Sequence, residues 1–177
     1  MRNLTALAAV AALAALVAAP VVAETVKAEV ALATPSGPGA GIGTVTFRDT
    51  PGGANIDVSL HGLPPGEHGF HIHANASCDP GLVNGEMAPA GGAGGHYDPA
   101  MTRMHAGPEG AGHLGDLPFL TVGSDGTDHE TLTAPRIADV TTLKGHSVMI
   151  HAGGDNYADQ PKPLGGGGAR IACGVIR

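Results

Sequence analysis

The segment Val-Lys-Ala-Glu-Val-Ala-Leu at residues 26–32 places apolar side chains at every second position, with Lys27 and Glu29 between them. Successive side chains of a strand point to opposite faces, so this pattern predicts a strand with one buried face. Similar alternation occurs around Val45 and Phe47 and again over residues 56–60. Each run is bounded by glycine or proline, as strands joined by turns require. The sequence therefore predicts an all-β protein of antiparallel strands, built as a sandwich or a barrel.

Two long segments, residues 77–116 and 153–168, lack this pattern and are rich in glycine. The chain contains 29 glycines and 14 prolines, a composition that disorder would also explain, but the alternating runs argue against disorder. A structureless loop of this length is uncommon in a domain unless function orders it. We therefore expect two long functional loops on a β framework.

The N-terminus has the form of an export signal. A short positive start with Arg2 precedes an apolar run over residues 4–19, and Val21-Val22-Ala23 ends it with a small residue. We expect residues 1–23 to be a signal peptide and residues 24–177 to be one domain. A membrane anchor is the alternative, but the apolar run is short for a span, which takes roughly 20 residues. No other segment could cross a bilayer, so we expect no stable membrane insertion after signal removal, and a periplasmic location in a bacterium.

The charge balance is acidic. Nine basic and 16 acidic residues give a net charge of -7, and loss of Arg2 with the signal leaves eight basic residues and a net charge of -8. A nucleic-acid partner would require a basic face, so this class of partner is not expected. A small anionic substrate would have to be guided by a local positive group.

Cys78 and Cys173 are the only cysteines. In the oxidising space that an export signal implies, an even number of cysteines favours a disulfide, and only one intramolecular pairing exists. Such a bond would close a loop of about 95 residues, which the chain-entropy account values at about 4 to 5 kcal/mol. Two buried free thiols are the alternative.

Histidines on two expected strands share one face. Between Gly69 and Ala74, Phe70 and Ile72 point to one side of the strand, and His71 and His73 point to the other. If the apolar pair faces the core, both imidazoles project outward beneath the loops. The same parity sets His151 opposite the apolar residues 148 and 150, whereas His68 has the opposite parity to His71 and is expected to be a hydrogen-bonded structural residue. Three imidazoles can thus converge, and an all-imidazole set suits copper.

A second group lies in the first long segment: His96, His105, His113 and Asp116. Three nitrogens and one carboxylate complete a tetrahedron, which is typical of a closed structural zinc site. Each of these histidines alone would be an ordinary surface residue. Together with the first group they are too many for one mononuclear site, so we predict two metals that share one histidine.

These residues occur within longer motifs. The motifs are Gly-Glu-His-Gly-Phe-His-Ile-His at 66–73, Gly-Gly-His-Tyr-Asp-Pro at 94–99, His-Ala-Gly-Pro-Glu-Gly-Ala-Gly-His-Leu-Gly-Asp-Leu-Pro at 105–118, Ile-His-Ala-Gly-Gly-Asp-Asn-Tyr-Ala-Asp at 150–159 and Pro-Leu-Gly-Gly-Gly-Gly-Ala-Arg-Ile-Ala-Cys-Gly-Val-Ile at 163–176. In this order they resemble the copper-zinc superoxide dismutases, specifically the exported bacterial branch. The resemblance covers nearly all of residues 24–177.

The resemblance implies a Greek-key β-sandwich, or flattened barrel, of immunoglobulin-like architecture. It also implies one copper and one zinc per chain. The implied copper ligands are His71, His73, His96 and His151. The implied zinc ligands are His96, His105, His113 and Asp116, with His96 bridging the two ions.

Three further roles come from the resemblance alone. Asp155 would hydrogen-bond one copper ligand, His71, and one zinc ligand, His105. The pairing of Cys78 with Cys173 would be the disulfide of the family, which anchors the first long loop to the last strand. Arg170 would lie beside the copper and attract the anionic substrate.

The implied activity is dismutation of superoxide to dioxygen and hydrogen peroxide by a redox-cycling copper. The bridging His96 would be released from reduced copper, take a proton and later deliver it, while zinc would order the loop. Two other functions remain as alternatives: a copper-buffering protein on the same fold, and a zinc-stabilised structural module. Strand patterning does not choose between a monomer and a homodimer.

Overall fold

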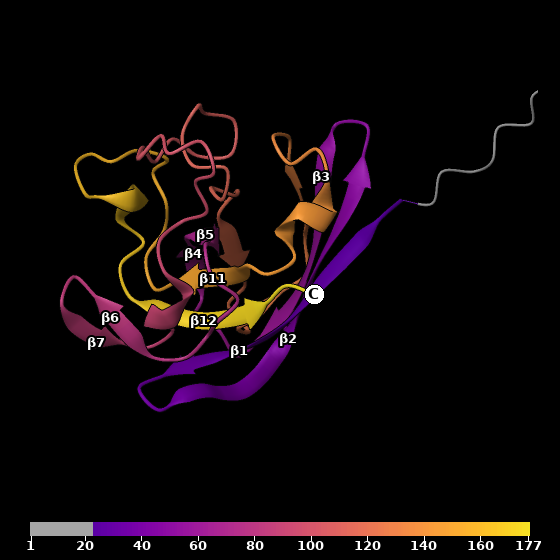
Figure 1. Ribbon diagram of the computed structural model, residues 1–177. Coiled ribbons are helices and arrows are strands. Elements are labelled where there is room, and N and C mark those ends of the chain that lie inside the picture. Colours follow the sequence, from indigo (N-terminus) through magenta and orange to yellow (C-terminus); the bar gives the residue numbers. More distant parts are fainter. Residues whose placement is uncertain (1–22) are drawn as a thin grey trace, which may run out of the picture.

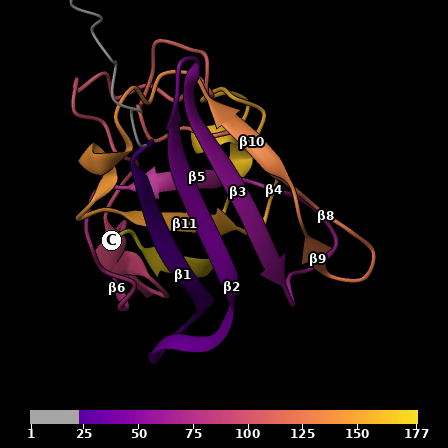
Figure 2. The same cartoon turned by 90° about the vertical axis from the view of Figure 1, so that its right-hand side faces the viewer.

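Three long antiparallel strands begin the fold: β1 (Thr25–Thr34), β2 (Gly37–Thr50) and β3 (Gly53–His61). They correspond to the three alternating runs of the sequence and lie side by side in Figure 2. The register sets Val26 opposite Phe47 and Val45 opposite Val58, so that one face of the three strands is apolar. This computed structural model describes residues 23–177 (Figure 1), and the expected signal peptide lies outside them except for its last residue.

The remaining strands complete one curved sheet and a short pair. Their bounds are β4 (Gly66–His68), β5 (Phe70–His73), β8 (Leu120–Val122), β9 (Thr127–Asp128), β10 (Thr131–Ala134), β11 (Ser147–His151) and β12 (Arg170–Val175). The main sheet has the order β10-β3-β2-β1-β12-β11-β5, with β9 also paired to β3, and β4 pairs with β8. Every pairing is antiparallel.

The sheet curls until its two ends meet. β4 and β5 are separated by Gly69 alone, so β8, which pairs with β4, continues the end of the sheet that β5 forms. At the other end of β8, the Gly123 N–H donates to the Thr127 carbonyl at the turn into β9. The connections from β3 to β4 and from β10 to β11, which includes the 3-10 helix η2 (Val140–Leu143), pass across the strands between them. The predicted all-β Greek-key sandwich or flattened barrel is confirmed.

The core fills the interior of this barrel. Its largest fully buried apolar side chains include Phe47, Phe70, Leu60, Leu117 and Ile150, which come from segments that are distant in the chain. Burial of one such side chain contributes about 1.5–3 kcal/mol, so these contacts stabilise the closed barrel. Among residues 23–177, no helix has the length and apolar character that a membrane crossing requires.

The first long loop contains structure that the sequence prediction missed. β6 (Gly81–Val83) and β7 (Glu86–Ala88) form a hairpin, and the 3-10 helix η1 (Gly91–Ala93) follows it. Asn84 and Gly85 occupy the two turn positions with φ of 53° and 88°, which is the left-handed geometry that Asn-Gly supplies in a tight hairpin. The Asn-Gly pair was the available signal. The second loop contains only the short 3-10 helix η3 (Leu164–Gly166).

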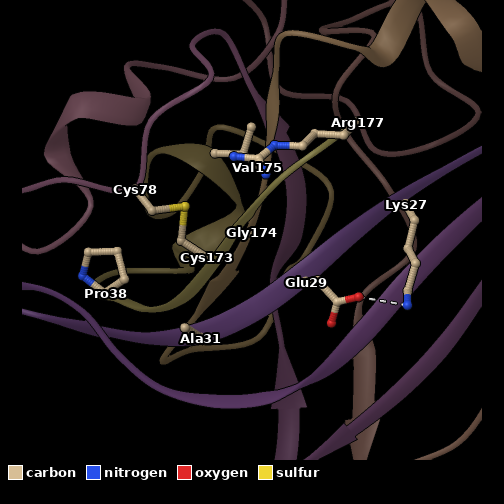
Figure 3. Close-up of a pocket in the computed structure, with 9 residues that line it drawn as sticks. All are labelled: Lys27, Glu29, Ala31, Pro38, Cys78, Cys173, Gly174, Val175 and Arg177. Atoms are coloured by element: carbon tan, nitrogen blue, oxygen red, sulfur yellow. Dashed lines mark ion pairs between the residues drawn. A yellow bond between two sulfur atoms is a disulfide. The ribbon is translucent and has the colours of Figure 1, made fainter.

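The disulfide between Cys78 and Cys173 is present, as the sequence predicted. It joins the beginning of the first long loop to β12 in the main sheet. Figure 3 shows it beside a pocket of about 380 Å³ whose other walls include Pro38, Lys27 and Arg177. None of the predicted metal ligands lines this pocket.

We expect replacement of both cysteines, Cys78→Ala with Cys173→Ala, to lower the free energy of unfolding of the metal-free protein by about 4 kcal/mol, because the closed loop spans 95 residues. Urea unfolding followed by circular dichroism measures this difference. Thiol titration of the denatured, unreduced parent should find no free cysteine. A loss below about 1 kcal/mol would show that the disulfide does not restrain the unfolded chain.

Candidate metal centre

Two neighbouring strands supply three of the imidazoles. β5 carries His71 and His73, and the adjacent strand β11 ends at His151. Phe70, Ile72 and Ile150 point into the main core, so the predicted division of faces is confirmed. The three imidazoles lie on the outer face of the barrel, and the long loops cover them so completely that all three residues are buried.

Four imidazole nitrogens converge where these strands meet the first loop. They belong to His71, His73, His96 and His151, whose ligand atoms lie within 4.8 Å of one another. Four buried nitrogens lack a hydrogen-bond partner here: Nδ1 of His71, and Nε2 of His73, His96 and His151. A buried polar atom without a partner is costly, and a metal ion satisfies such atoms together. This donor set fits copper.

In each imidazole on β5 and β11, one ring nitrogen forms a hydrogen bond. That bond determines which nitrogen keeps a lone pair for a metal. His73 Nδ1 donates to the Gly94 carbonyl at 2.8 Å, and His151 Nδ1 donates to the Gly168 carbonyl at 3.1 Å. A carbonyl can only accept, so each Nδ1 carries the proton and each Nε2 presents a lone pair. His71 Nε2 donates to a carboxylate oxygen of Asp155 at 2.7 Å, which leaves its Nδ1 free. Such outer partners orient metal-binding imidazoles.

A second group forms around Asp116. Its Oδ1 lies 2.9 Å from His96 Nδ1, 3.0 Å from His105 Nδ1 and 3.3 Å from His113 Nδ1. Ligands at the 2.0–2.1 Å bond lengths of zinc are separated by about 3.3 Å along the edges of a tetrahedron, so these spacings suit that ion. His105 Nδ1 lies close to the carboxylate but lacks hydrogen-bond geometry. This nitrogen therefore does not point at Asp116 as a hydrogen-bond donor does, and the group fits a zinc ion.

Asp155 connects the two groups. Oδ2 accepts from His71 Nε2, and Oδ1 accepts from His105 Nε2 at 2.8 Å. The contact that the family resemblance implied is therefore present in the structure. Asp155 lies in the second loop, so its carboxylate joins that loop to β5 and to the first loop.

Arg170 lies at the mouth of the first group. A pocket of about 200 Å³ opens there, lined in part by His73, His96, His151 and Arg170. The Arg170 guanidinium donates to the carbonyls of Ala90 and Gly94 at 2.7 and 2.6 Å. Gly94 thus accepts from both Arg170 and His73, which holds the positive group beside a predicted copper ligand. A small anion entering this pocket would meet Arg170.

The electrostatics of the two groups differ. Burial, and next the charge of His96, lower the pKa of His71 to about 3, and burial lowers the pKa of His151 to about 4. For His105, burial lowers the pKa, but the nearby carboxylate of Asp116, 3.0 Å from its Nδ1, and the hydrogen bond of its Nε2 with Asp155 outweigh burial and raise the pKa to about 9. The first group is therefore neutral near pH 7 and ready to coordinate, whereas the second must release a proton on binding a metal.

Some supporting residues were not found from the sequence. Asp159 accepts from the backbone N–H of His105 at 3.0 Å and from that of Leu164 at 3.3 Å, which joins the two loops. Arg136 donates to two carbonyls of the first loop. No sequence pattern around Asp159 or Arg136 indicates these roles, because each residue forms hydrogen bonds with a segment far away in the chain. His68 is buried with its ring nitrogens 2.7 and 2.8 Å from the carbonyls of His151 and Pro64, which confirms its predicted structural role.

Comparison with known proteins agrees with this arrangement. A family model described as copper/zinc superoxide dismutase matches residues 42–176. The chain is 52% identical to superoxide dismutase [Cu-Zn] of Brucella abortus over 161 residues, which are 91% of this chain and 93% of that protein. The chain belongs to the copper/zinc superoxide dismutase family. This enzyme dismutes superoxide and uses copper and zinc.

Other relatives cover the chain to a similar extent. Superoxide dismutase [Cu-Zn] of Escherichia coli is 52% identical over 167 residues, 94% of this chain and 96% of that one. The solved structure of the Brucella abortus enzyme matches with a TM-score of 0.85 at 51% identity, over 87% of this chain and all of the other. The solution structure of a monomeric enzyme from Salmonella enterica has a TM-score of 0.76 at 54% identity, with the same coverage.

The metal-free enzyme should be most stable near pH 6.5. Unfolded histidines gain protons below about pH 6.5, whereas buried His71 and His151 resist protonation to about pH 3 and 4, so the free energy of unfolding falls with acid. His105 keeps its proton to about pH 9, so its contribution is lost as the pH rises from 6.5. Burial and Glu130 raise the pKa of Asp128 to about 7, which opposes the acid-side slope by at most one proton.

Urea unfolding of the metal-free protein between pH 4 and 9 measures this profile. Each proton contributes a slope of about 1.4 kcal/mol per pH unit. In a His151→Ala variant the acid-side slope of the free energy of unfolding should decrease by about one proton. A profile that rises steadily toward acid would contradict the assigned protonation states.

Proposed function

We propose that His71, His73, His96 and His151 hold the copper, and that His96, His105, His113 and Asp116 hold the zinc. The observation that carries this proposal is the position of His96. Its Nε2 is one of the four unpartnered nitrogens of the first group, and its Nδ1 lies 2.9 Å from Asp116 in the second. One imidazole with a nitrogen directed at each group is what a bridge between two ions requires.

The chemistry is divided between the metals and the protein. Copper, when bound, supplies one-electron transfer by alternating between two adjacent oxidation states, and zinc has no redox chemistry. Two superoxide anions and two protons yield one dioxygen and one hydrogen peroxide. We assign His96 Nε2 as the atom that takes up and delivers a proton, which its position between the groups supports. His96 also lines the pocket that Arg170 lines, so protons can reach this side of the group from solvent.

Arg170 is assigned to attract and orient superoxide. The protein is acidic overall, so the long-range field does not favour an anion. Arg170 is a positive group that lines the pocket over the proposed copper ligands, and two short hydrogen bonds hold it there. A fixed guanidinium concentrates an anion locally without the need for a basic surface.

Two alternative functions make different predictions. A copper-buffering protein would bind copper through the same four imidazoles but turn over no superoxide. A zinc-stabilised module would hold one metal per chain. The presence of Arg170 at the open side of the first group favours catalysis, because copper storage needs no anion site.

We expect the purified protein, loaded with copper and zinc, to dismute superoxide with a rate constant of about 10⁸ to 10⁹ M⁻¹s⁻¹, near the diffusional ceiling. Stopped-flow decay of superoxide absorbance measures this rate. Removal of copper should abolish the activity. The variant His151→Ala removes one proposed copper ligand and should lose the activity with its copper, while zinc is retained.

The variant His61→Ala is a matched control, because it removes an exposed imidazole from β3. It should keep the parental rate and both metals. Full activity in His151→Ala would disprove the copper assignment. Copper and zinc bound in equal amounts without turnover would favour copper buffering.

We also propose that residues 1–23 are a signal peptide and that residues 24–177 are the dismutase domain, exported to the periplasm. The apolar run after Arg2 and the exit at Ala23 support this division. The disulfide of the domain is compatible with an oxidising compartment.

Expression of the full chain in a bacterium tests the location. The protein recovered from the periplasmic fraction should have the mass of residues 24–177. The control variant Leu13→Arg interrupts the apolar run and should stay in the cytoplasm with residues 1–23 attached. Uncleaved protein in the membrane fraction would favour the anchor.

For assembly, the sequence left a monomer and a homodimer open. The relative from Salmonella enterica is described as monomeric, which supports a monomer. A homodimer would need an apolar contact surface of about 800 Å² on each copy. The hairpin β6–β7 could form part of such a surface. Its cross-strand partners Leu82 and Met87 have 69% and 68% of their surfaces exposed. Sedimentation equilibrium at micromolar concentration distinguishes the two states.

A further inference from the structure

Arg136 is a half-buried cation outside both groups of proposed ligands. It follows the end of β10, between Ala134 and Ile137, which are both in the core. The Ile137 N–H donates to the Ala134 carbonyl at 3.2 Å and closes a tight turn around Arg136. The backbone of Arg136 is therefore fixed to the barrel, and its side chain reaches out from that fixed base.

The guanidinium holds two consecutive carbonyls of the first loop. Nη1 donates to the His113 carbonyl at 3.0 Å, and Nη2 donates to the Gly112 carbonyl at 2.8 Å. These bonds cross 23 and 24 residues of sequence. The loop passes close to itself at this point, since a Cβ on Gly112 would clash with the Met104 carbonyl. The His113 N–H also donates to that carbonyl at 2.9 Å.

His113 is the least restrained of the proposed zinc ligands. Its side chain is 10% exposed, against 1% for His96 and 0% for His105. Its Nδ1 is also the farthest of the three from Asp116. His105 is oriented through its second nitrogen by Asp155, but within residues 23–177 no side chain or carbonyl accepts from Nε2 of His113. Apart from the 3.3 Å contact of its Nδ1 with Asp116, the direction of the His113 imidazole therefore depends on its backbone.

We propose that Arg136 is a positioning residue for zinc: by clamping the carbonyls of Gly112 and His113 to the barrel, it aims the His113 imidazole at the ion. This inference rests on the proposed assignment of His113 as a zinc ligand. Arg136 belongs to neither group of proposed ligands and does not line the pocket of Arg170. Its effect is to prepare the site, so that less loop entropy is lost when zinc binds.

Arginine suits this role better than lysine. The guanidinium is a planar fork whose nitrogens can donate to two neighbouring oxygens at a fixed spacing. An ammonium group is a compact charge on a flexible stem and has no such fixed spacing. Replacement of Arg136 by lysine therefore keeps the charge and removes the geometry.

Zinc affinity tests the proposal. The purified protein is stripped of metals and titrated with zinc alone against a chelator. We expect Arg136→Met to raise the zinc dissociation constant about tenfold, as loss of an outer partner of a metal ligand typically does. Arg136→Lys should lie between Arg136→Met and the parent. Arg48→Met, which removes an arginine from an exposed ion pair with Asp57, is the matched control and should stay within twofold of the parent.

A second measurement separates aiming from general packing. In the metal-free protein, hydrogen exchange of the His113 amide should be faster in Arg136→Met, whereas the barrel amides of Val148 and Ile150 should exchange as in the parent. Faster exchange throughout the barrel would overturn the proposal in favour of a packing role. If Arg136→Met does not fold, Arg136→Lys carries the test, and a parental zinc affinity in that variant overturns the proposal.

The variant His113→Ala distinguishes this failure from failure of the site assignment. If His113→Ala binds zinc as tightly as the parent, the zinc ligand set is wrong, and the role of Arg136 falls with it. If His113→Ala binds zinc weakly but Arg136→Met stays within twofold of Arg48→Met, the ligand set stands and the role of Arg136 alone is overturned.

Discussion

The carboxylate of Asp155 links three segments on which both groups of ligands depend. One oxygen accepts from His71 on β5, and the other accepts from His105 in the first loop, while Asp155 belongs to the second loop. The contact is buried, where little water screens the interaction. Burial raises the pKa of Asp155, but its hydrogen bonds with the two histidines outweigh burial and lower it, so the group stays charged. One carboxylate therefore fixes an imidazole of each group.

The barrel and the loops contribute differently. The barrel provides a face with His71, His73 and His151, and it is held by the hydrogen-bonded strands and by core packing. The loops are long and rich in glycine, so ordering them costs conformational entropy. Their order comes from separate polar and covalent links to the barrel, among them the disulfide Cys78–Cys173, the hydrogen bond of Asp155 with His71 and the hydrogen bonds of Arg136.

Charge is arranged locally in an otherwise acidic protein. Arg170 and His73 donate to the same Gly94 carbonyl. The group assigned to attract superoxide is therefore held next to a proposed copper ligand. Burial keeps His71 in the first group neutral, whereas the carboxylates of Asp116 and Asp155 keep a proton on His105 in the second group. The same residue type thus has two electrostatic characters a few ångströms apart.

Local patterns in the sequence predicted the strands and the faces of His71, His73 and His151, because alternation along a strand follows from covalent geometry. The hairpin at Asn84 and Gly85 was within reach of the same local reasoning. Asp155 and Arg170 came from resemblance to a family, since neither stands in a periodic pattern. Arg136, Asp159 and the choice of free nitrogen on each imidazole could be read only from the folded chain. Each depends on a partner tens of residues away, and folding alone brings those partners together.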